Sequence, residues 1–426
     1  GVVTDISAET PPIKRRHLVA CVIGNALEFY DFTVYTFFAI QIGHTFFPFK
    51  TPFLSLMASL ITFGVGFIGR PIGAVILGAY GDKHGRKPAM LWSFALMGFG
   101  VLALALTPSY AAIGAAAPVI VVLARLLQGF ALGGEVGPTT AFLMEAAKPH
   151  NRGVFTTLQY VSQGANTIFA AGLGYALTFF FDAQGLQDFG WRIAFMVGAL
   201  ILPIGFILRA HLPETHKAPP ERAFLPLAEW LSQGRTIVLG ILSLAASTIT
   251  IYVLYFLPTY VTHYLHADAR IALLSGLVFG ISNLVFSFVG GWSSDKIGRK
   301  PVMVIPRALQ VLTVVPCFMW LIASPTAPVL LSITAIITML GVLSAGANLV
   351  AVTELLPKHI RAGSLATVYA IAIATFGGTT QPIIAEMLDK SGDLLSPAYY
   401  LMGASIVGVI AMSLMPETAP VKTGER

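Results

Sequence analysis

Long apolar runs separated by short polar stretches extend along the chain from residue 17 to residue 415. Each is about 20 residues or longer, the length that an α-helix needs to cross ~30 Å of hydrocarbon. None has the strict alternation over about ten residues that marks a membrane β-strand. The pattern predicts an all-α membrane protein with twelve transmembrane helices, at 17–42, 53–81, 88–107, 117–146, 153–181, 191–209, 236–263, 271–294, 301–322, 328–355, 361–387 and 397–415.

The composition supports this class of protein. Hydrophobic residues make up 56% of the 426 residues and charged residues only 11%, whereas soluble proteins average about 25% charged residues. The apolar run after the polar residues 1–16 is too long for a cleaved signal peptide, so we expect the first helix to be retained. Cys21 and Cys317 both fall in predicted helices, and no disulfide framework is expected.

Positive charges are distributed unevenly. Most of the 26 Lys and Arg residues lie in the two tails and in the loops that follow even-numbered helices. Because basic residues mark the cytoplasmic side, both termini are expected in the cytoplasm, with the protein in a cell membrane and a bacterial inner membrane favoured. The net charge of +6 follows from this topology and does not indicate a nucleic-acid partner.

A charged motif occurs twice, half a chain apart. "GAYGDKHGRKPAM" (78–90) follows predicted helix 2, and "GWSSDKIGRKPVM" (291–303) follows helix 8. The duplication predicts two halves with the same orientation, related by a pseudo-twofold axis along the membrane normal. The sequence predicts two six-helix bundles, at 17–209 and 236–415, joined by a linker at 210–235. An N-terminal tail at 1–16 and a C-terminal tail at 416–426 flank them.

These motifs carry a family resemblance. The repeated Gly-x-x-x-Asp-Lys-x-Gly-Arg-Lys-Pro loop and "RLLQG" (125–129) resemble signatures of the major facilitator superfamily. "GNALEFYDF" (24–32) and "RLLQGFALGGEVG" (125–137) are similar to its metabolite:proton symporter branch, which takes up citrate, tricarballylate, 2-oxoglutarate, shikimate, betaine and similar solutes. "FGGTTQP" (376–382) and "SPAYYLM" (396–402) are similar to the citrate and tricarballylate members. The resemblance implies secondary transport by alternating access.

The resemblance also implies a latch between helices that breaks as the halves rock. An alternative is that these charges only fix the topology. The candidate gating residues are Asp82, Arg86, Lys87, Glu145, Arg152, Asp295, Arg299, Lys300, Glu354 and Arg361.

Charges inside the predicted helices are candidates for the transport site, because a charge at the bilayer centre costs at least about 2.5–3.5 kcal/mol. Helix rise places Asp31 and Arg70 near the midplane, Glu28 slightly toward the cytoplasm and Arg125 in the outer third. Arg307 follows Pro301 closely, so we interpret it as snorkelling to the cytoplasmic surface.

Two arginines within the membrane favour an anionic substrate, because guanidinium binds carboxylate through two parallel hydrogen bonds and stays charged. Arg70 is the predicted carboxylate anchor; the alternative is a permanent ion pair with Asp31 or Glu28. Polar stripes on helices 5 and 7 predict a water-filled cavity, with helix–helix hydrogen bonding as the alternative. The candidate substrate-binding residues are Arg70, Arg125, Asn25, Tyr30, Gln159, Gln163, Asn166, Tyr252, Tyr255, Asn283, Asn348 and Tyr369.

Asp31 is the predicted proton carrier, with Glu28 on the same helical face as the alternative. The resemblance implies that Arg125 controls the proton affinity of the helix 1 acid. Burial favours a protonated carboxyl group and a nearby guanidinium favours the ionised form, so a changing contact between them would load and release a proton. Glu135 lies among glycines and is a candidate for either coupling or structural hydrogen bonding.

An enzyme is not expected, since all nine histidines lie in loops or at helix ends. No phosphate-binding loop is found, and no cofactor beyond the co-transported proton is expected. His263, His266 and Asp268 offer a surface metal site or, alternatively, solvated loop residues. The chain is expected to act as a monomer.

The expected function is proton-coupled uptake of an organic carboxylate, a tricarboxylate such as citrate or tricarballylate being favoured. Moving each negative charge inward costs about 2.3 kcal/mol per 100 mV, which proton symport offsets. The alternatives are a dicarboxylate or 2-oxoglutarate, shikimate, betaine or proline held by an aromatic cage of Tyr30, Tyr252 and Tyr255, and drug:proton antiport, for which two arginines in the membrane are not expected.

Overall fold

The computed structural model is built from α-helices and describes residues 15–84, 86–133, 143–144, 146–211, 227–357 and 361–425. Within these ranges, eleven helices are long and apolar enough to cross a membrane. The 29-residue helix α9 (Arg152–Phe180) is a twelfth long helix, and it is more polar because Gln159, Gln163 and Asn166 follow one another along it. The predicted all-α, twelve-helix architecture is confirmed.

The first half contains six long helices in sequence order. Its first helix is broken at Phe38 into two segments, and its last is preceded by a short helix and a π-helical turn. The elements are α2 (Arg15–Phe37), α3 (Ala39–Phe46), α4 (Pro52–His84), α5 (Arg86–Leu106), α6 (Tyr110–Ile113), α7 (Ala116–Gly133), η1 (Pro149–Asn151), α9, α10 (Ala183–Gly185), η2 (Leu186–Gly190) and α11 (Trp191–Ala210).

The second half repeats this plan. Its fifth helix contains a π-helical turn, a feature found often at functional sites. The elements are α12 (Leu227–Ser232), α13 (Gly234–His263), α14 (Ala269–Ile297), α15 (Arg299–Ala323), α16 (Ala327–Leu355), α17 (Arg361–Ala372), the π turn η4 (Ile373–Gly377), α18 (Gly378–Ser391), α19 (Ser396–Leu414) and α20 (Pro420–Thr423).

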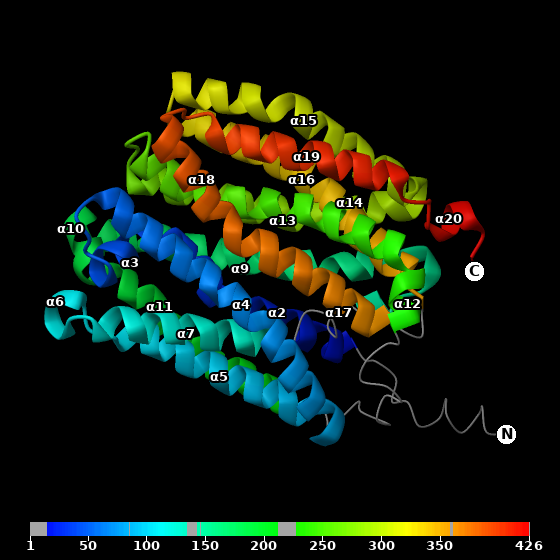
Figure 1. Ribbon diagram of the computed structural model, residues 1–426, viewed down its shortest axis with the longest axis horizontal. Helices are drawn as coiled ribbons and strands as arrows, with labels where there is room; N and C mark the ends of the chain where they lie inside the picture. The colour runs from blue at the N-terminus through cyan, green and yellow to red at the C-terminus, as the bar shows by residue number, and fades with distance from the viewer. Residues whose placement is uncertain are drawn as a thin grey trace.

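The two halves lie side by side, with their long helices roughly parallel to one another (Figure 1). They meet where α9 packs against α14 and where α4 packs against α18. We call the end of the bundle that carries the start of α9, the end of α14 and the start of α15 the latch end. The beginning of α2 and helix α20 also lie there, whereas α3, α6 and α10 lie at the opposite end (Figure 1).

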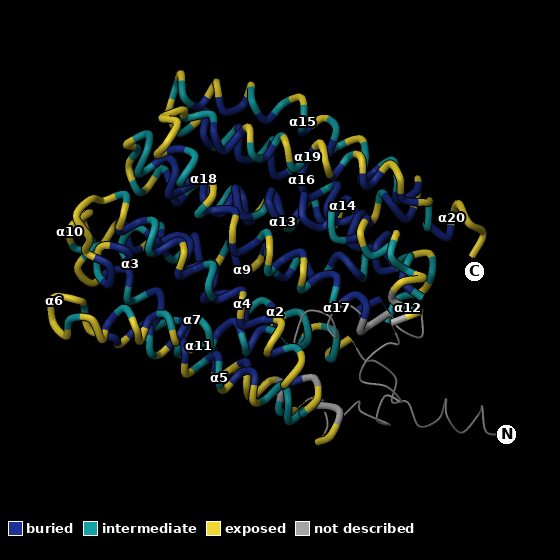
Figure 2. Tube along the Cα trace, in the orientation of Figure 1, coloured by how far each residue is buried: buried dark blue, intermediate teal, exposed yellow. Residues whose placement is uncertain are grey.

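The outside of the bundle is apolar and the inside contains many polar side chains. Phe99, Leu200 and Leu312 are among the large apolar side chains that are mostly exposed, whereas Arg125 and Arg307 are fully buried. Figure 2 shows that exposed positions recur along the outward faces of the helices, while buried positions follow the interior. An apolar exterior of this extent marks a surface that contacts lipid.

The halves touch backbone to backbone at several places, and two of these contacts lie on opposite sides of the bundle centre. A Cβ atom added to Gly64 of α4 would lie 2.3 Å from the carbonyl oxygen of Gly378 in α18. A Cβ atom added to Gly153 at the start of α9 would lie 2.5 Å from the carbonyl oxygen of Gly291 in α14. Only glycine permits approach this close. The first contact lies nearer the opposite end and the second at the latch end, so the halves meet on both sides of the bundle centre.

Candidate functional site

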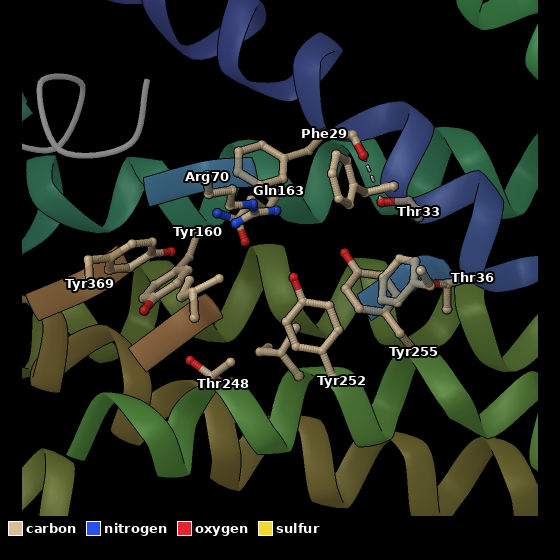
Figure 3. A pocket seen from close by; sticks show the side chains of 14 residues that line it. Phe29, Thr33, Thr36, Arg70, Tyr160, Gln163, Thr248, Tyr252, Tyr255 and Tyr369 are labelled. Carbon is tan, nitrogen blue, oxygen red and sulfur yellow. Dashed lines mark hydrogen bonds between the residues drawn. The ribbon is translucent and has the colours of Figure 1, made fainter. Parts of the chain in front are cut away.

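A cavity lies between the two halves near the middle of the bundle. Its volume is about 40 Å³, room for about three water molecules. Arg70 is its one charged lining residue among the described side chains. The lining consists of Phe29, Phe32, Thr33, Thr36, Phe63, Arg70, Tyr160 and Gln163 from the first half and Thr248, Ile251, Tyr252, Tyr255, Tyr369 and Ile373 from the second (Figure 3).

Arg70 extends from α4 into this cavity and packs against aromatic rings. Its guanidinium carbon lies 4.4 Å from the ring centre of Phe67 and 5.0 Å from that of Phe32. The side chain is 5% exposed, and its Nε and Nη2 have no hydrogen-bond partner among the residues that the structure describes. Arg70 forms no ion pair with Asp31 or Glu28 in the described parts of the chain, so the alternative of a permanent ion pair is not seen there. Donors buried in this way can bind an anion.

Arg125 lies behind the cavity wall, next to Asp31. Its Nη1 is 3.6 Å from Asp31 Oδ2 and donates a hydrogen bond of 2.7 Å to Gln128 Oε1. Its Nη2 donates to the carbonyl oxygen of Phe63 (3.2 Å). Arg125 does not line the cavity in this structure, although the Phe32 ring, 4.0 Å from its guanidinium carbon, does.

Asp31 is 2% exposed, and neither carboxylate oxygen accepts a hydrogen bond in the described parts of the chain. Within those parts of the chain, the negative charge of Asp31 is therefore balanced by the guanidinium of Arg125, 3.6 Å away, and not by a hydrogen-bond donor. The arrangement brings together the helix 1 acid and the helix 4 arginine that were predicted to act as a pair. Removal of Arg125 from this contact would favour proton uptake by the carboxylate.

Several predicted residues of the first half point away from the cavity. Glu28 is fully buried and accepts a hydrogen bond from Ser93 Oγ of α5 (3.3 Å). The Tyr30 hydroxyl donates to the carbonyl oxygen of Ala194 in α11 (2.7 Å). Both side chains thus join helices within the first half, and Tyr30 cannot complete an aromatic cage with Tyr252 in this arrangement.

The amides of α2 and α9 divide into two groups. Asn25 Nδ2 donates to Ser162 Oγ (2.6 Å) and Asn166 Nδ2 donates to Thr33 Oγ1 (2.7 Å), so both join α2 to α9. Gln163 lines the cavity. Gln159 is buried, and neither end of its amide has a hydrogen-bond partner within the described ranges.

The second half contributes tyrosines to the cavity but not the two asparagines that were predicted. Tyr252, Tyr255 and Tyr369 line it, and the Tyr252 hydroxyl points toward Arg70 (Figure 3). Asn283 accepts a hydrogen bond from Ser287 Oγ within α14 (2.9 Å). Asn348 is fully buried in α16. Neither asparagine is among the lining residues.

The interpretation of Arg307 as a snorkelling residue is wrong, because its side chain is 0% exposed. Its guanidinium donates to the hydroxyls of Thr250 (2.9 Å) and Ser247 (2.9 Å), to Gln310 Oε1 (2.8 Å) and to the carbonyl oxygen of Gly341 (3.3 Å). All four acceptors are neutral, and Arg307 forms no ion pair with a described acid. The position of Arg307 near the start of its helix indicated that the side chain could reach the surface. In the structure, the face of α15 that carries Arg307 packs against α13 and α16.

The environment of Arg307 repeats a local pattern of Arg125. "RLLQ" (125–128) and "RALQ" (307–310) each place a glutamine three residues after the arginine, and in both the guanidinium donates to that glutamine. This spacing is the sequence signal that identifies Arg307 as a buried residue.

Sequence reasoning missed Tyr160, Thr33 and Thr36 as lining residues. The predicted stripe of α9 was centred on Gln159 and Gln163, whereas the face that meets the cavity contains Tyr160 and Gln163. One residue corresponds to about 100° of rotation about a helix. The spacing of four between polar residues predicted a polar stripe on this helix. It did not determine the rotation of the helix about its own axis, and so not which face meets the cavity.

Charged residues join the halves at the latch end. Arg152 Nη1 of α9 lies 2.7 Å from Glu354 Oε2 of α16. Asp295 accepts hydrogen bonds from the backbone N–H groups of Gly153 (2.9 Å) and Val154 (3.1 Å) at the start of α9, a favourable place for a carboxylate. Arg299 binds Glu354 and Asp295, each at 2.7 Å. We call Arg152, Asp295, Arg299 and Glu354 the latch.

The structure describes two further gating candidates, Lys300 and Lys87. Lys300 Nζ donates to the carbonyl oxygen of Ser413 (2.9 Å), within the second half, and Lys87 lies in the first turn of α5. The gating candidate Glu145 and the coupling candidate Glu135 lie outside the described residues, as do the side chains of the gating candidates Asp82, Arg86 and Arg361.

Contacts between the halves also occur at the opposite end. Arg270 Nη2 of α14 donates to the carbonyl oxygen of Thr178 in α9 (3.1 Å). Closer to the cavity, the hydroxyls of Thr167 and Tyr255 lie 2.8 Å apart. The described ranges contain no cluster of three or more His, Cys, Asp or Glu side chains that could hold a metal ion.

Comparisons with known proteins agree with this architecture. A family model of the Major Facilitator Superfamily matches residues 21–380. A citrate-proton symporter of Salmonella typhi is 35% identical over 422 residues, which cover 96% of each chain. The glycine betaine/proline/ectoine/pipecolic acid transporter OusA of Dickeya dadantii (strain 3937) is 30% identical over 423 residues, covering 95% of this chain and 84% of that one.

A solved structure of a D-xylose-proton symporter superposes with a TM-score of 0.74 at 21% identity, covering 96% of this chain and 99% of that one. At this identity the likeness shows the fold. Two six-helix halves around a charged central cavity define a multi-pass membrane transporter. The chain belongs to the Major Facilitator Superfamily.

Proposed function

We propose that this chain is a proton-coupled symporter that takes up an organic carboxylate by alternating access, with a tricarboxylate such as citrate or tricarballylate as the favoured substrate. The observation that carries the proposal is Arg70, a buried guanidinium with unpartnered donors and the one charged residue among the described cavity lining. The citrate-proton symporter of Salmonella typhi, similar over nearly the whole of both chains, supports the same substrate class.

The charge of the site favours an anion. A carboxylate can accept two parallel hydrogen bonds from the guanidinium of Arg70, and the hydroxyls of Tyr252 and Tyr369 supply further polar contacts in the same cavity. Arg307, fully buried behind α13 and without an acidic partner among the described residues, adds a second positive charge on the side of the second half. Two uncompensated cations suit a substrate with more than one carboxylate.

A zwitterion such as betaine or proline is the second candidate. The transporter OusA is named for such solutes, and Phe29, Phe32 and Tyr252 give the cavity an aromatic wall that could hold an ammonium group. Arg70 already occupies the Phe32 ring face at 5.0 Å, and it would repel a cationic group placed there. A carboxylate without an amine is therefore favoured.

The Asp31–Arg125 pair is the proposed coupling element. The Phe32 ring contacts both Arg70 and Arg125, so a substrate that draws Arg70 toward its carboxylate would also alter the packing of Arg125. A weaker contact between Arg125 and Asp31 favours protonation of the carboxylate. The co-transported proton offsets part of the roughly 2.3 kcal/mol per 100 mV that each anionic charge costs on inward transport.

The cavity must widen to bind such a substrate, since about 40 Å³ holds only about three waters. We propose that the latch opens and closes one route to it, and that the contact between Gly64 and Gly378 closes the other. In this scheme the protein acts as a monomer in the cell membrane, with a bacterial inner membrane favoured and the proton as its coupling ion.

Uptake into proteoliposomes tests the proposal. Vesicles with an imposed inward proton gradient are offered radiolabelled citrate, tricarballylate, succinate, 2-oxoglutarate, shikimate and betaine in turn. We expect gradient-driven accumulation of a tricarboxylate. Arg70→Gln should weaken its binding by at least about 30-fold, since loss of one partner of a buried charge pair costs about 2 kcal/mol or more.

Arg192→Gln is the matched control, because Arg192 donates to the carbonyl oxygen of Ala105 outside the cavity. It should leave uptake unchanged. Accumulation of betaine, without uptake of any of the amine-free carboxylates, would identify a zwitterion as the substrate instead. Proton-driven export of cationic compounds would identify an antiporter, and undiminished citrate binding by Arg70→Gln would remove Arg70 as the anchor.

A further inference from the structure

A second hollow lies at the latch end of the second half, away from the central cavity. It is framed by the starts of α13 and α15 and the ends of α16 and α19, and its volume is about 480 Å³. The substrate proposal does not use it. We call it the basic hollow, and it is lined by Arg235, Thr236, Leu239, Lys300, Leu355, Ser413, Leu414, Met415 and Pro416.

Its two cations are held in place by the backbone of α19. Arg235 Nη2 donates to the carbonyl oxygen of Leu414 (3.2 Å), and Lys300 Nζ donates to that of Ser413 (2.9 Å). Each keeps further donors available, and neither forms an ion pair with an acidic side chain in the described ranges. The nearby Glu417 carboxylate accepts from the backbone N–H groups of Arg299 (3.0 Å) and Lys300 (3.4 Å).

The wall of the hollow continues into a lipid-facing surface. Leu414 is 53% exposed and Val238, one turn from Arg235, is 54% exposed. Large apolar side chains this exposed on a membrane protein contact hydrocarbon, whereas Arg and Lys at helix ends reach the headgroup level. The basic hollow therefore straddles the boundary between headgroups and acyl chains, and its ligand must offer an anionic group and hydrocarbon at once.

We propose that the basic hollow binds an anionic phospholipid. Arg235 and Lys300 hold the phosphodiester, and the acyl chains run along Leu414 and Val238. A free phosphate would leave the apolar wall unused, and the ammonium of a zwitterionic headgroup would face two cations. A headgroup without an amine, such as phosphatidylglycerol, fits the charges best.

The lipid would lie against the same helix ends that carry the latch. Lys300 directly follows Arg299, and Leu355 directly follows Glu354. Arg299 binds Glu354 at 2.7 Å. The phospholipid thus contacts the residues next to this ion pair on both of its helices.

Native mass spectrometry of the full-length, detergent-purified protein tests the assignment. Phosphatidylglycerol, phosphatidylethanolamine, phosphatidylcholine and inorganic phosphate are titrated separately. We expect phosphatidylglycerol to bind most tightly and the double variant Arg235→Gln/Lys300→Gln to bind it about 30-fold more weakly, since each basic residue near an anionic lipid contributes about a fivefold effect. The conservative pair Arg235→Lys/Lys300→Arg should retain binding, which separates loss of charge from loss of fold.

The matched control is Lys50→Gln/Lys390→Gln, which removes two exposed cations at the opposite end. It should bind phosphatidylglycerol as the wild type does. An equal loss in this control would show attraction by net charge alone and overturn the proposal. Equal affinity of the wild type and Arg235→Gln/Lys300→Gln would also overturn it, as would inorganic phosphate competing fully with the lipid.

Discussion

Two of the backbone contacts between the halves, at Gly64 and at Gly153, can each be widened by a single methyl group. In Gly64→Ala the new Cβ would lie 2.3 Å from the carbonyl oxygen of Gly378, whereas ordinary contacts begin at 3.4 Å. Helices α4 and α18 must therefore separate by about 1.1 Å, the difference of the two distances. In Gly153→Ala the Cβ would lie 2.5 Å from the carbonyl oxygen of Gly291, and the same subtraction gives about 0.9 Å.

Each substitution penalises only the states in which its own contact is closed. Overpacking costs about 1–3 kcal/mol, which shifts the ratio of open to closed states by about 5- to 150-fold. The higher helix propensity of alanine, worth about 1 kcal/mol, acts in every state. We therefore expect little change in thermal stability, with Gly64→Ala opening the cavity toward the opposite end and Gly153→Ala opening it toward the latch end.

A single reporter cysteine measures this shift. Thr36→Cys lines the cavity, and the free Cys21 and Cys317 are first replaced by serine. A membrane-impermeant maleimide is applied to right-side-out and inverted vesicles. Gly64→Ala and Gly153→Ala should speed labelling from opposite sides of the membrane.

Gly98→Ala is the control, because a Cβ atom there has no neighbour within 4 Å. It should label as the reporter alone does. If Gly64→Ala and Gly153→Ala also label like the control from both sides, the two glycine contacts do not act as closures.

Two further substitutions address the buried charges. Asp31→Asn should abolish accumulation driven by a proton gradient while substrate exchange across the membrane continues, and undiminished accumulation in the same proteoliposomes would exclude Asp31 as the proton carrier. Arg307→Met should lower the free energy of unfolding by only about 1–2 kcal/mol, because its acceptors are neutral and Thr250 also donates to the carbonyl oxygen of Ala246 at 2.8 Å. Calorimetry should show that Arg307→Met loses more affinity for citrate than for a monocarboxylate, and that Arg307→Lys recovers it. Equal losses of affinity for both substrates would show that Arg307 only contributes to packing.

Helix positions could be predicted because the hydrocarbon core imposes a minimum apolar length on every crossing. The ends of the helices and the interruptions within them were harder to predict from the sequence. The first helix was expected at 17–42, and the structure has α2 and α3 from Arg15 to Phe46 with a break at Phe38. The helix expected at 361–387 continues to Ser391 and contains the π turn η4, because no single residue type specifies an extra residue in a helical turn.

The direction of buried side chains was harder to predict than their depth. Arg70 and Asp31 were placed by counting the rise along a helix, and both are buried in the structure. Tyr30 and Arg307 were assigned to the cavity and to the cytoplasmic surface respectively. Their acceptors, Ala194 and Ser247 among them, come from other helices, and one sequence does not place those helices around the side chain.

The confined space at the centre of the bundle has a consequence for energy conservation. A continuous file of water would conduct protons across the membrane and dissipate the gradient that drives accumulation. The cavity has room for only about three waters, and the halves touch on either side of it, so it holds only a short stretch of any such file. Closure of either route to the cavity would interrupt the file, so a carrier that always keeps one route closed does not drain the proton supply of the cell when no solute is available.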